Sequence, residues 1–196
     1  LFHDALLDRC SSGSGEIQNF DFEQLKTLDC GGWFAPEFIG EPMASLQELL
    51  ELAEQSGTGL NLEIKPTPER EAETVEAVAL LLEQIQPSCP IVISSFSKLA
   101  LRAAKERLAD YQRGLLVDDI PLDWPEQLEE FGASALHAQD AHLDETALAE
   151  LKAAGIPLLI YTVNSPERFL QLMKEGVSAV FTDNPARLIA AIPVSD

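Results

Sequence analysis

From Leu60 to the C-terminus, short apolar runs alternate with segments whose apolar positions recur at helical spacing. The centres of the apolar runs lie about 20–30 residues apart, which is the spacing of βα units. Six such units in succession predict a parallel sheet covered by helices. The predicted strands are Leu60–Lys65, Ile91–Ser95, Gly114–Val117, Ala133–Ala138, Pro157–Val163 and Ala179–Thr182. A barrel and an open doubly wound sheet both fit, but no G-x-G-x-x-G follows the first strand to favour a dinucleotide fold.

Capping signals bound the predicted helices. Ser45 and Glu48 have the spacing of a capping box. Glycines 155 and 176 have the position of helix stops before a strand. Two further helices are expected behind a cap followed by proline, at Thr67-Pro68 and at Ser165-Pro166. The expected helices cover Leu46–Glu54, the apolar stripe at 75–85, and Phe169–Lys174.

The first 45 residues have a different composition, rich in glycine, serine and aromatic residues. This composition predicts a loop-rich insertion over residues 4–44, either a lid or a small subdomain that contacts substrate. Residues 45–196 would then supply the βα units, and residues 1–196 would form a single domain. Leu1-Phe2-His3-Asp4 resembles the end of a strand and no initiator Met precedes it, so we expect further sequence upstream.

Charge and cysteine content indicate which partners and which cellular compartment the protein is suited to. The formal net charge is −20, from 33 acidic and 13 basic residues. Nucleic acids and anionic membrane surfaces need a basic footprint, so both are disfavoured as partners, whereas a small anionic substrate is not. No apolar run approaches the roughly 20 residues that span a bilayer, so membrane insertion is not expected. Three irregularly spaced cysteines argue against a disulfide framework and favour a reducing compartment, so we expect a cytoplasmic location.

Candidate chemistry begins where the first predicted strand ends. Glu63 and Lys65 are two residues apart and therefore share a face of that strand. A carboxylate suits a hard divalent cation, and a lysine ammonium suits a phosphate oxygen. His3 adds a group that can move a proton near neutral pH. A simple ion pair at a strand end is the alternative interpretation of Glu63 and Lys65.

Three aromatic residues are further candidates for substrate contact. Phe96 directly follows one later predicted strand and Tyr161 lies near the end of another, where barrel enzymes place their chemistry. Trp33 lies in the predicted insertion and either lines the site or belongs to the insertion's own small core. His137 and His142 attract attention as ligands, but a spacing of five gives them no shared direction.

Several segments together resemble the glycerophosphodiester phosphodiesterase family, and most closely its bacterial cytosolic members. Each motif alone is weak, but their number and order over nearly the whole chain make the set specific. Cys10 stands where the family usually has threonine. The matching segments are Phe2-His3-Asp4 with Leu7-Asp8-Arg9, Leu28-Asp29-Cys30-Gly31-Gly32-Trp33-Phe34, Phe38-Ile39-Gly40-Glu41-Pro42-Met43, Leu62-Glu63-Ile64-Lys65-Pro66, Ile93-Ser94-Ser95-Phe96, Gly114-Leu115-Leu116, Tyr161-Thr162-Val163-Asn164 and Thr182-Asp183-Asn184-Pro185.

The resemblance implies a TIM (β/α)8 barrel with a small insertion after strand 2. This chain would lack the first strand-helix unit and most of the second strand. It also implies hydrolysis of glycerophosphodiesters to an alcohol and sn-glycerol 3-phosphate with Mg²⁺ or Ca²⁺. By position, His3 resembles one of two catalytic histidines, Glu63 a metal ligand, and Lys65 the lysine that contacts phosphate beside the metal. The second histidine, its adjacent arginine and two acidic ligands would precede Leu1, so the resemblance leaves the activity of the 196-residue chain alone an open question. With sheet edges left open, we expect this chain to be less stable than a complete barrel and prone to associate.

Two alternatives stay open at this point. The first is a related barrel phosphodiesterase that acts on lysophospholipids or another phosphodiester, which a wide apolar mouth around Trp33, Phe34 and Phe96 would favour. The second is a barrel that binds a ligand without catalysis.

Overall fold

The computed structural model describes residues 1–193 and divides into two compact units. The first, which we call the N-terminal unit, contains Leu1–Leu60, Thr67–Arg70 and Ala77–Pro90. The second, the sheet unit, contains Asn61–Pro66, Glu71–Glu76 and the chain from Ile91. None of the helices within residues 1–193 has the length and apolar character needed to cross a membrane.

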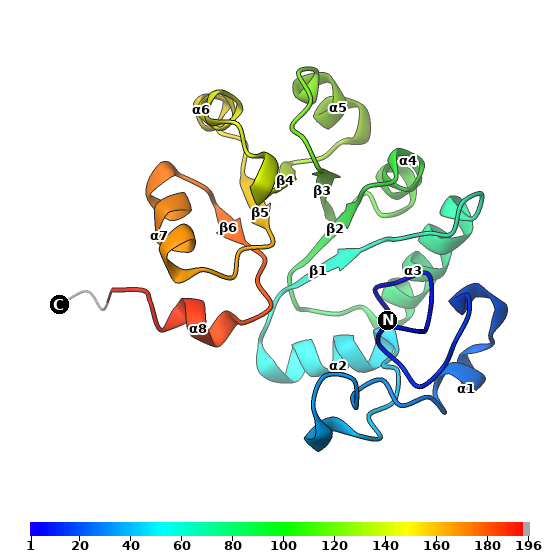
Figure 1. The fold of residues 1–196 in the computed structure, drawn as a ribbon. Coiled ribbons are helices and arrows are strands. Elements are labelled where there is room, and N and C mark those ends of the chain that lie inside the picture. The colour runs from blue at the N-terminus through cyan, green and yellow to red at the C-terminus, as the bar shows by residue number, and fades with distance from the viewer. Residues whose placement is uncertain (194–196) are drawn as a thin grey trace. The chain divides into compact units, whose positions relative to one another are not determined.

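The sheet unit is built on six parallel strands whose order in space is their order in sequence, β1-β2-β3-β4-β5-β6 (Figure 1). This order confirms six successive βα units that curl in one direction. A doubly wound sheet would reverse its strand order at a switch point, so that alternative is wrong. The strands are β1 (Leu60–Glu63), β2 (Ile91–Ser95), β3 (Gln112–Val117), β4 (Ala135–Gln139), β5 (Leu158–Tyr161) and β6 (Ala179–Val180).

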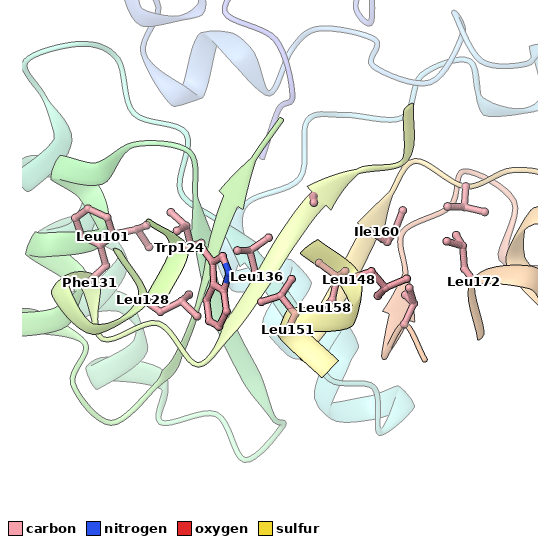
Figure 2. Packing of buried hydrophobic residues seen from close by; sticks show 14 residues of the cluster. Leu101, Trp124, Leu128, Phe131, Leu136, Leu148, Leu151, Leu158, Ile160 and Leu172 are labelled. Carbon is pink, nitrogen blue, oxygen red and sulfur yellow. The ribbon is translucent and has the colours of Figure 1, made fainter. Parts of the chain in front are cut away.

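Helices follow the strands and bury one face of the sheet. They are α3 (Glu71–Ile85), α4 (Lys98–Arg107), α5 (Trp124–Phe131), α6 (Glu145–Ala154), α7 (Pro166–Glu175) and α8 (Pro185–Ile189), with a 3-10 turn η3 (Asp140–His142). Figure 2 shows the packing between strands and helices, with Leu136 from β4 and Ile160 from β5 among the helical leucines. Because side chains alternate along a strand, His137 lies on the opposite face from Leu136 and Ala138.

Most helix boundaries follow the predicted signals. The Ser165 side chain caps α7 by accepting a hydrogen bond from the amide of Arg168, at 3.2 Å. Gly155 and Gly176 end α6 and α7 with φ of 69° and 101°, which are left-handed values that favour glycine. The predicted capping box of α2 (Leu46–Ser56) is present, with Glu48 accepting from the Ser45 amide at 2.7 Å.

The predicted cap at Thr67-Pro68 is wrong. Helix α3 begins only at Glu71, and its N-cap Arg70 makes no side-chain cap. Thr67 instead opens a turn that is closed by a hydrogen bond from the Arg70 amide to the Thr67 carbonyl, at 3.0 Å. Glu69 has φ of 70°, so the segment has proline at the second position of the turn and a left-handed residue at the third. Proline fits that turn as well as it fits a first helical turn, which explains the error.

The N-terminal unit contains little regular structure before α2. Its short elements are η1 (Ile17–Asn19), α1 (Phe22–Leu25) and η2 (Pro36–Phe38), together with an isolated bridge between Leu6 and Glu16. Three buried residues, Leu7, Leu25 and Met43, form a small core. Phe2, Ile17, Leu28 and Cys30 pack around this core.

Candidate active site

At the carboxyl end of β1, the backbone of Ile64 is fixed between strands. Its amide donates to the Ser94 carbonyl at 2.7 Å, and the Ser95 hydroxyl donates to the Ile64 carbonyl at 2.5 Å. The side chain of Ile64 is buried, and because side chains alternate along extended backbone, Glu63 and Lys65 on either side of it point to the opposite face. Both side chains are exposed, as a site for a charged ligand requires.

Tyr161, at the end of β5, is held by its hydroxyl and by its ring. The hydroxyl oxygen lies 2.8 Å from the Val117 carbonyl oxygen and 3.1 Å from Asp118 Oδ1. The ring packs edge-to-face on Phe96, with 5.9 Å between centroids. Burial raises the pKa of Tyr161 well above its usual value, and the hydrogen bond to Asp118 and the charge of Glu63 raise it further. The hydroxyl therefore stays protonated and donates its hydrogen bond to groups of the β3 end.

In the N-terminal unit, Asp4 joins His3 to Arg9. His3 Nδ1 lies 2.6 Å from Asp4 Oδ1, while Arg9 donates to both carboxylate oxygens at 2.6 and 2.8 Å. The hydrogen bonds from Arg9 and then from His3 hold the pKa of Asp4 far below its usual value. An ionised carboxylate can only accept, so the proton lies on Nδ1 of His3. Nε2 is thereby the acceptor in the neutral ring, and it belongs to a side chain that is 70% exposed.

A pocket of about 320 Å³ lies beside this group in the N-terminal unit. Arg9 contributes a guanidinium and His3 an imidazole to its lining, and Trp33 lies under Arg9 with 5.8 Å between the guanidinium carbon and the ring centroid. The indole nitrogen of Trp33 donates to the Cys30 carbonyl at 2.9 Å, which fixes the ring. The remaining lining is mainly apolar: Leu1, Phe2, Cys10, Cys30, Pro42, Met43 and Ala44.

The predicted site residues thus fall into two groups, each within one unit. His3 and Trp33 line the pocket of the N-terminal unit, whereas Glu63, Phe96 and Tyr161 gather at the carboxyl end of the sheet. Lys65 is exposed and lies two residues beyond the end of β1. Sequence reasoning missed Asp118 as the partner of Tyr161. The position of Asp118 directly after a buried strand could have marked it as a candidate. Its pairing with Tyr161 could not be predicted in this way, because the two residues are 43 positions apart.

The residues do not form a complete metal centre by themselves. Within residues 1–193, no group of three or more histidine, cysteine, aspartate or glutamate side chains is arranged to hold a metal ion. Glu63 is therefore a single candidate ligand. The three cysteines are free thiols, as the irregular spacing predicts.

The other two histidines lie apart, as predicted. His142 is exposed and pairs with Asp119 at 3.2 Å. His137 is fully buried on the inner face of the sheet, against the Phe181 ring at 5.3 Å between centroids. Neither ring nitrogen of His137 has a hydrogen-bond partner among the described residues. Burial lowers the pKa of His137 to about 4, so the ring is neutral at physiological pH.

Parallel strands in sequential order, with charged side chains at their carboxyl ends, are the arrangement found in (β/α) barrel enzymes. The model of the glycerophosphoryl diester phosphodiesterase family matches residues 1–187, and the chain belongs to that family. A glycerophosphodiester phosphodiesterase from Caldanaerobacter subterraneus subsp. tengcongensis is 28% identical over 190 residues, covering 96% of this chain and 78% of the relative. Another from Bacillus altitudinis is 26% identical over 192 residues, covering 96% and 78%.

Solved structures share the fold of this chain. An Oleispira antarctica phosphodiesterase, in complex with the product sn-glycerol-3-phosphate, superposes with a TM-score of 0.94 at 37% identity. The match covers 97% of this chain and 77% of that one. A glycerophosphodiester phosphodiesterase from Agrobacterium tumefaciens shares the fold with a TM-score of 0.77 at 22% identity, covering 96% and 79%.

Proposed function

We propose that this protein hydrolyses glycerophosphodiesters to an alcohol and sn-glycerol 3-phosphate by general acid-base catalysis. The observation that carries the proposal is the His3-Asp4 pair, because it fixes the tautomer of an exposed imidazole and leaves Nε2 available. Family membership supplies the reaction class, and the Oleispira relative was solved with the same product.

The roles follow from the chemistry of each group. His3 would exchange a proton with the leaving or attacking oxygen through Nε2, while Asp4 stabilises the imidazolium that forms. Lys65 would bind a phosphate oxygen and offset charge that develops during attack on phosphorus. Phe96 and Tyr161 present ring faces suited to the carbon skeleton of glycerol, and Trp33 would contact the substrate beside His3.

We further propose Glu63 as one ligand of Mg²⁺ or Ca²⁺, both of which prefer carboxylate oxygens. When bound, such an ion polarises a phosphoryl oxygen. Residues 1–193 do not complete a site for it, and the resemblance places the other acidic ligands before Leu1. The acidic surface and free thiols are in keeping with a small diffusible substrate in a reducing compartment, and we propose the cytoplasm.

The test is release of sn-glycerol 3-phosphate from glycerophosphocholine and glycerophosphoethanolamine, with Mg²⁺, Ca²⁺ or EDTA. It uses the 196-residue chain and a longer version that carries the family residues expected before Leu1. We expect turnover by the longer version, inhibited by EDTA and reduced by a factor of about 10²–10⁴ in His3→Ala. No turnover by a folded longer version would refute the proposal and favour a binding protein.

A further inference from the structure

The side chain of Tyr161 crosses the carboxyl end of a neighbouring strand. Tyr161 ends β5, and its hydroxyl reaches Val117 and Asp118 at the end of β3, although β4 lies between these two strands (Figure 1). Neighbouring strands are spaced by about 4.8 Å, so the side chain and its hydrogen bond together bridge about 10 Å. The ring of Tyr161 therefore passes over the end of β4.

His137 of β4 is the next side chain on the same face, on the amino-terminal side of this crossing. In the register of β4 and β5, Tyr161 is level with Gln139, which comes two residues after His137. Positions two apart on a strand share a face, so all three side chains project to the same side of the sheet. The opposite side of β4 carries Leu136, which packs against the helices.

The imidazole of His137 is closed off from the solvent on this face. It is fully buried, and neither ring nitrogen has a hydrogen-bond partner among residues 1–193. The Phe181 ring packs on it from the end of β6, with 5.3 Å between centroids. On β3, a Cβ added at Gly114 would come within 2.5 Å of the imidazole, so that strand also lies directly against the ring. The crossing of Tyr161 adds cover from the carboxyl side.

Two contacts hold the Tyr161 ring in this position. The hydroxyl has one hydrogen, which is shared between the Val117 carbonyl oxygen at 2.8 Å and Asp118 Oδ1 at 3.1 Å. The ring packs edge-to-face on Phe96, which directly follows β2, with an interplanar angle of 84°. The carbonyl belongs to the backbone, so the Asp118 carboxylate is the part of this anchor that a substitution can remove.

We propose that Asp118 is a positioning residue that acts through the Tyr161 hydroxyl: it holds the Tyr161 ring across β4, where Tyr161 and Phe96 form the base of the substrate site and separate His137 from it. The inference rests on the proposed function, because the glycerol of the substrate would lie on these rings. Without the anchor, the phenol ring can turn to another rotamer. The site would then be deeper, and His137 would be in contact with water.

Diethyl pyrocarbonate measures this closure directly, because it acylates neutral imidazoles that the solvent reaches. Burial lowers the pKa of His137 to about 4, so at pH 7 the ring is neutral and a failure to react reports its burial. The chain has three histidines, and the side chains of His3 and His142 are 70% and 44% exposed. In the unchanged protein, peptide mass spectrometry should find His3 and His142 acylated and His137 unreacted.

Two variants release the anchor in different ways. Asp118→Ala removes the carboxylate, whereas Tyr161→Phe removes the hydroxyl and keeps the ring. We expect both to raise the rate of His137 acylation at least about fivefold through local opening. Asp118→Asn should react at the rate of the unchanged protein, because its amide oxygen still accepts a hydrogen bond. Rates are compared at several low urea concentrations, since exposure by global unfolding increases with urea and the displacement of one ring does not.

Asp119→Ala is the matched control. Asp119 is the adjacent carboxylate, its side chain is 80% exposed, and it pairs with His142 at 3.2 Å. The control removes the same charge as Asp118→Ala and should leave His137 unreacted. An unreacted His137 in both Asp118→Ala and Tyr161→Phe would overturn the inference. Equal acylation rates in Asp118→Asn and Asp118→Ala would also overturn it, because the charge of the carboxylate would then be the cause.

Kinetics of the longer version test the link to the substrate. We expect Asp118→Ala and Tyr161→Phe to raise KM for glycerophosphocholine about three- to tenfold with little change in kcat, since the rings contact the glycerol in the ground state and the transition state alike. Asp118→Asn and Asp119→Ala should stay within about twofold of the unchanged protein. An unchanged KM in Asp118→Ala would overturn the positioning role. No turnover by the unchanged longer version would refute the proposed function, while acylation would still show whether Asp118 keeps His137 closed off.

Discussion

Acidification from pH 7 to pH 4 should destabilise the sheet unit through one buried imidazole. His137 is fully buried, and burial lowers its pKa from 6.5 to about 4. In the unfolded chain the same group takes up a proton near pH 6.5, so between these two pH values the unfolded state binds more protons than the folded state. His137 therefore imposes no penalty above about pH 6.5, and the free energy of unfolding falls as the pH drops from there toward 4.

The size of this effect follows from the two pKa values. One pKa unit corresponds to about 1.4 kcal/mol, so the difference between 6.5 and about 4 corresponds to about 3 kcal/mol at full protonation. A domain of this size is stable by about 5–15 kcal/mol, so the loss would be a large part of the total. Carboxylates such as Asp4 and Glu48, whose pKa values are lowered by hydrogen bonds, also contribute at low pH.

The variant His137→Leu isolates the imidazole, because leucine has a similar volume and does not titrate. Urea unfolding, followed by emission of Trp124 in the core of the sheet unit, gives the free energy of unfolding at each pH. We expect the variant to lose about 3 kcal/mol less than the unchanged protein between pH 7 and pH 4, since the carboxylate contributions cancel in the difference. Parallel pH dependences of the two proteins would refute the reasoning.

Three further predictions follow from local geometry. Asp4→Asn should reduce kcat of the longer version about 10–100-fold with a small change in KM, because the His3 tautomer is no longer fixed; equal kcat values would contradict this role. Gly114→Ala places a Cβ 2.5 Å from the His137 ring and should cost about 1–3 kcal/mol in urea unfolding, a loss that His137→Ala in the same chain should reduce. Ser165→Ala removes the cap of α7 and should cost about 1 kcal/mol, whereas Ser165→Asp should retain most of the stability.

The strands and most helix ends could be predicted because their causes are local. The short apolar runs predicted the ends of all six strands to within about two residues. The Ser165 cap and the two glycines that end helices are also found at the predicted positions. The Thr67-Pro68 segment shows the limit of such signals, because proline suits a turn and a helix start equally well.

Contacts distant in sequence could not be predicted in this way. Glu63 and Lys65 were expected to share a face because they are two residues apart, and their exposure on either side of the buried Ile64 follows that local pattern. The inward turn of the Tyr161 hydroxyl depends on Val117 and Asp118, which belong to another strand and the loop after it. No pattern within either segment specifies which acceptor the hydroxyl meets, because strand register determines it.

The hydrogen bonds that orient His3 have a consequence for how the molecule is assembled. Asp4 and Arg9 lie within six residues of His3 in sequence, and the indole under Arg9 belongs to the same unit. The contacts named here that orient the imidazole therefore all lie within the N-terminal unit, and none of them involves a strand of the sheet. If His3 transfers protons as proposed, substitutions of Glu63 or Lys65 in the sheet unit should thus change ligand binding without changing the orientation of the imidazole.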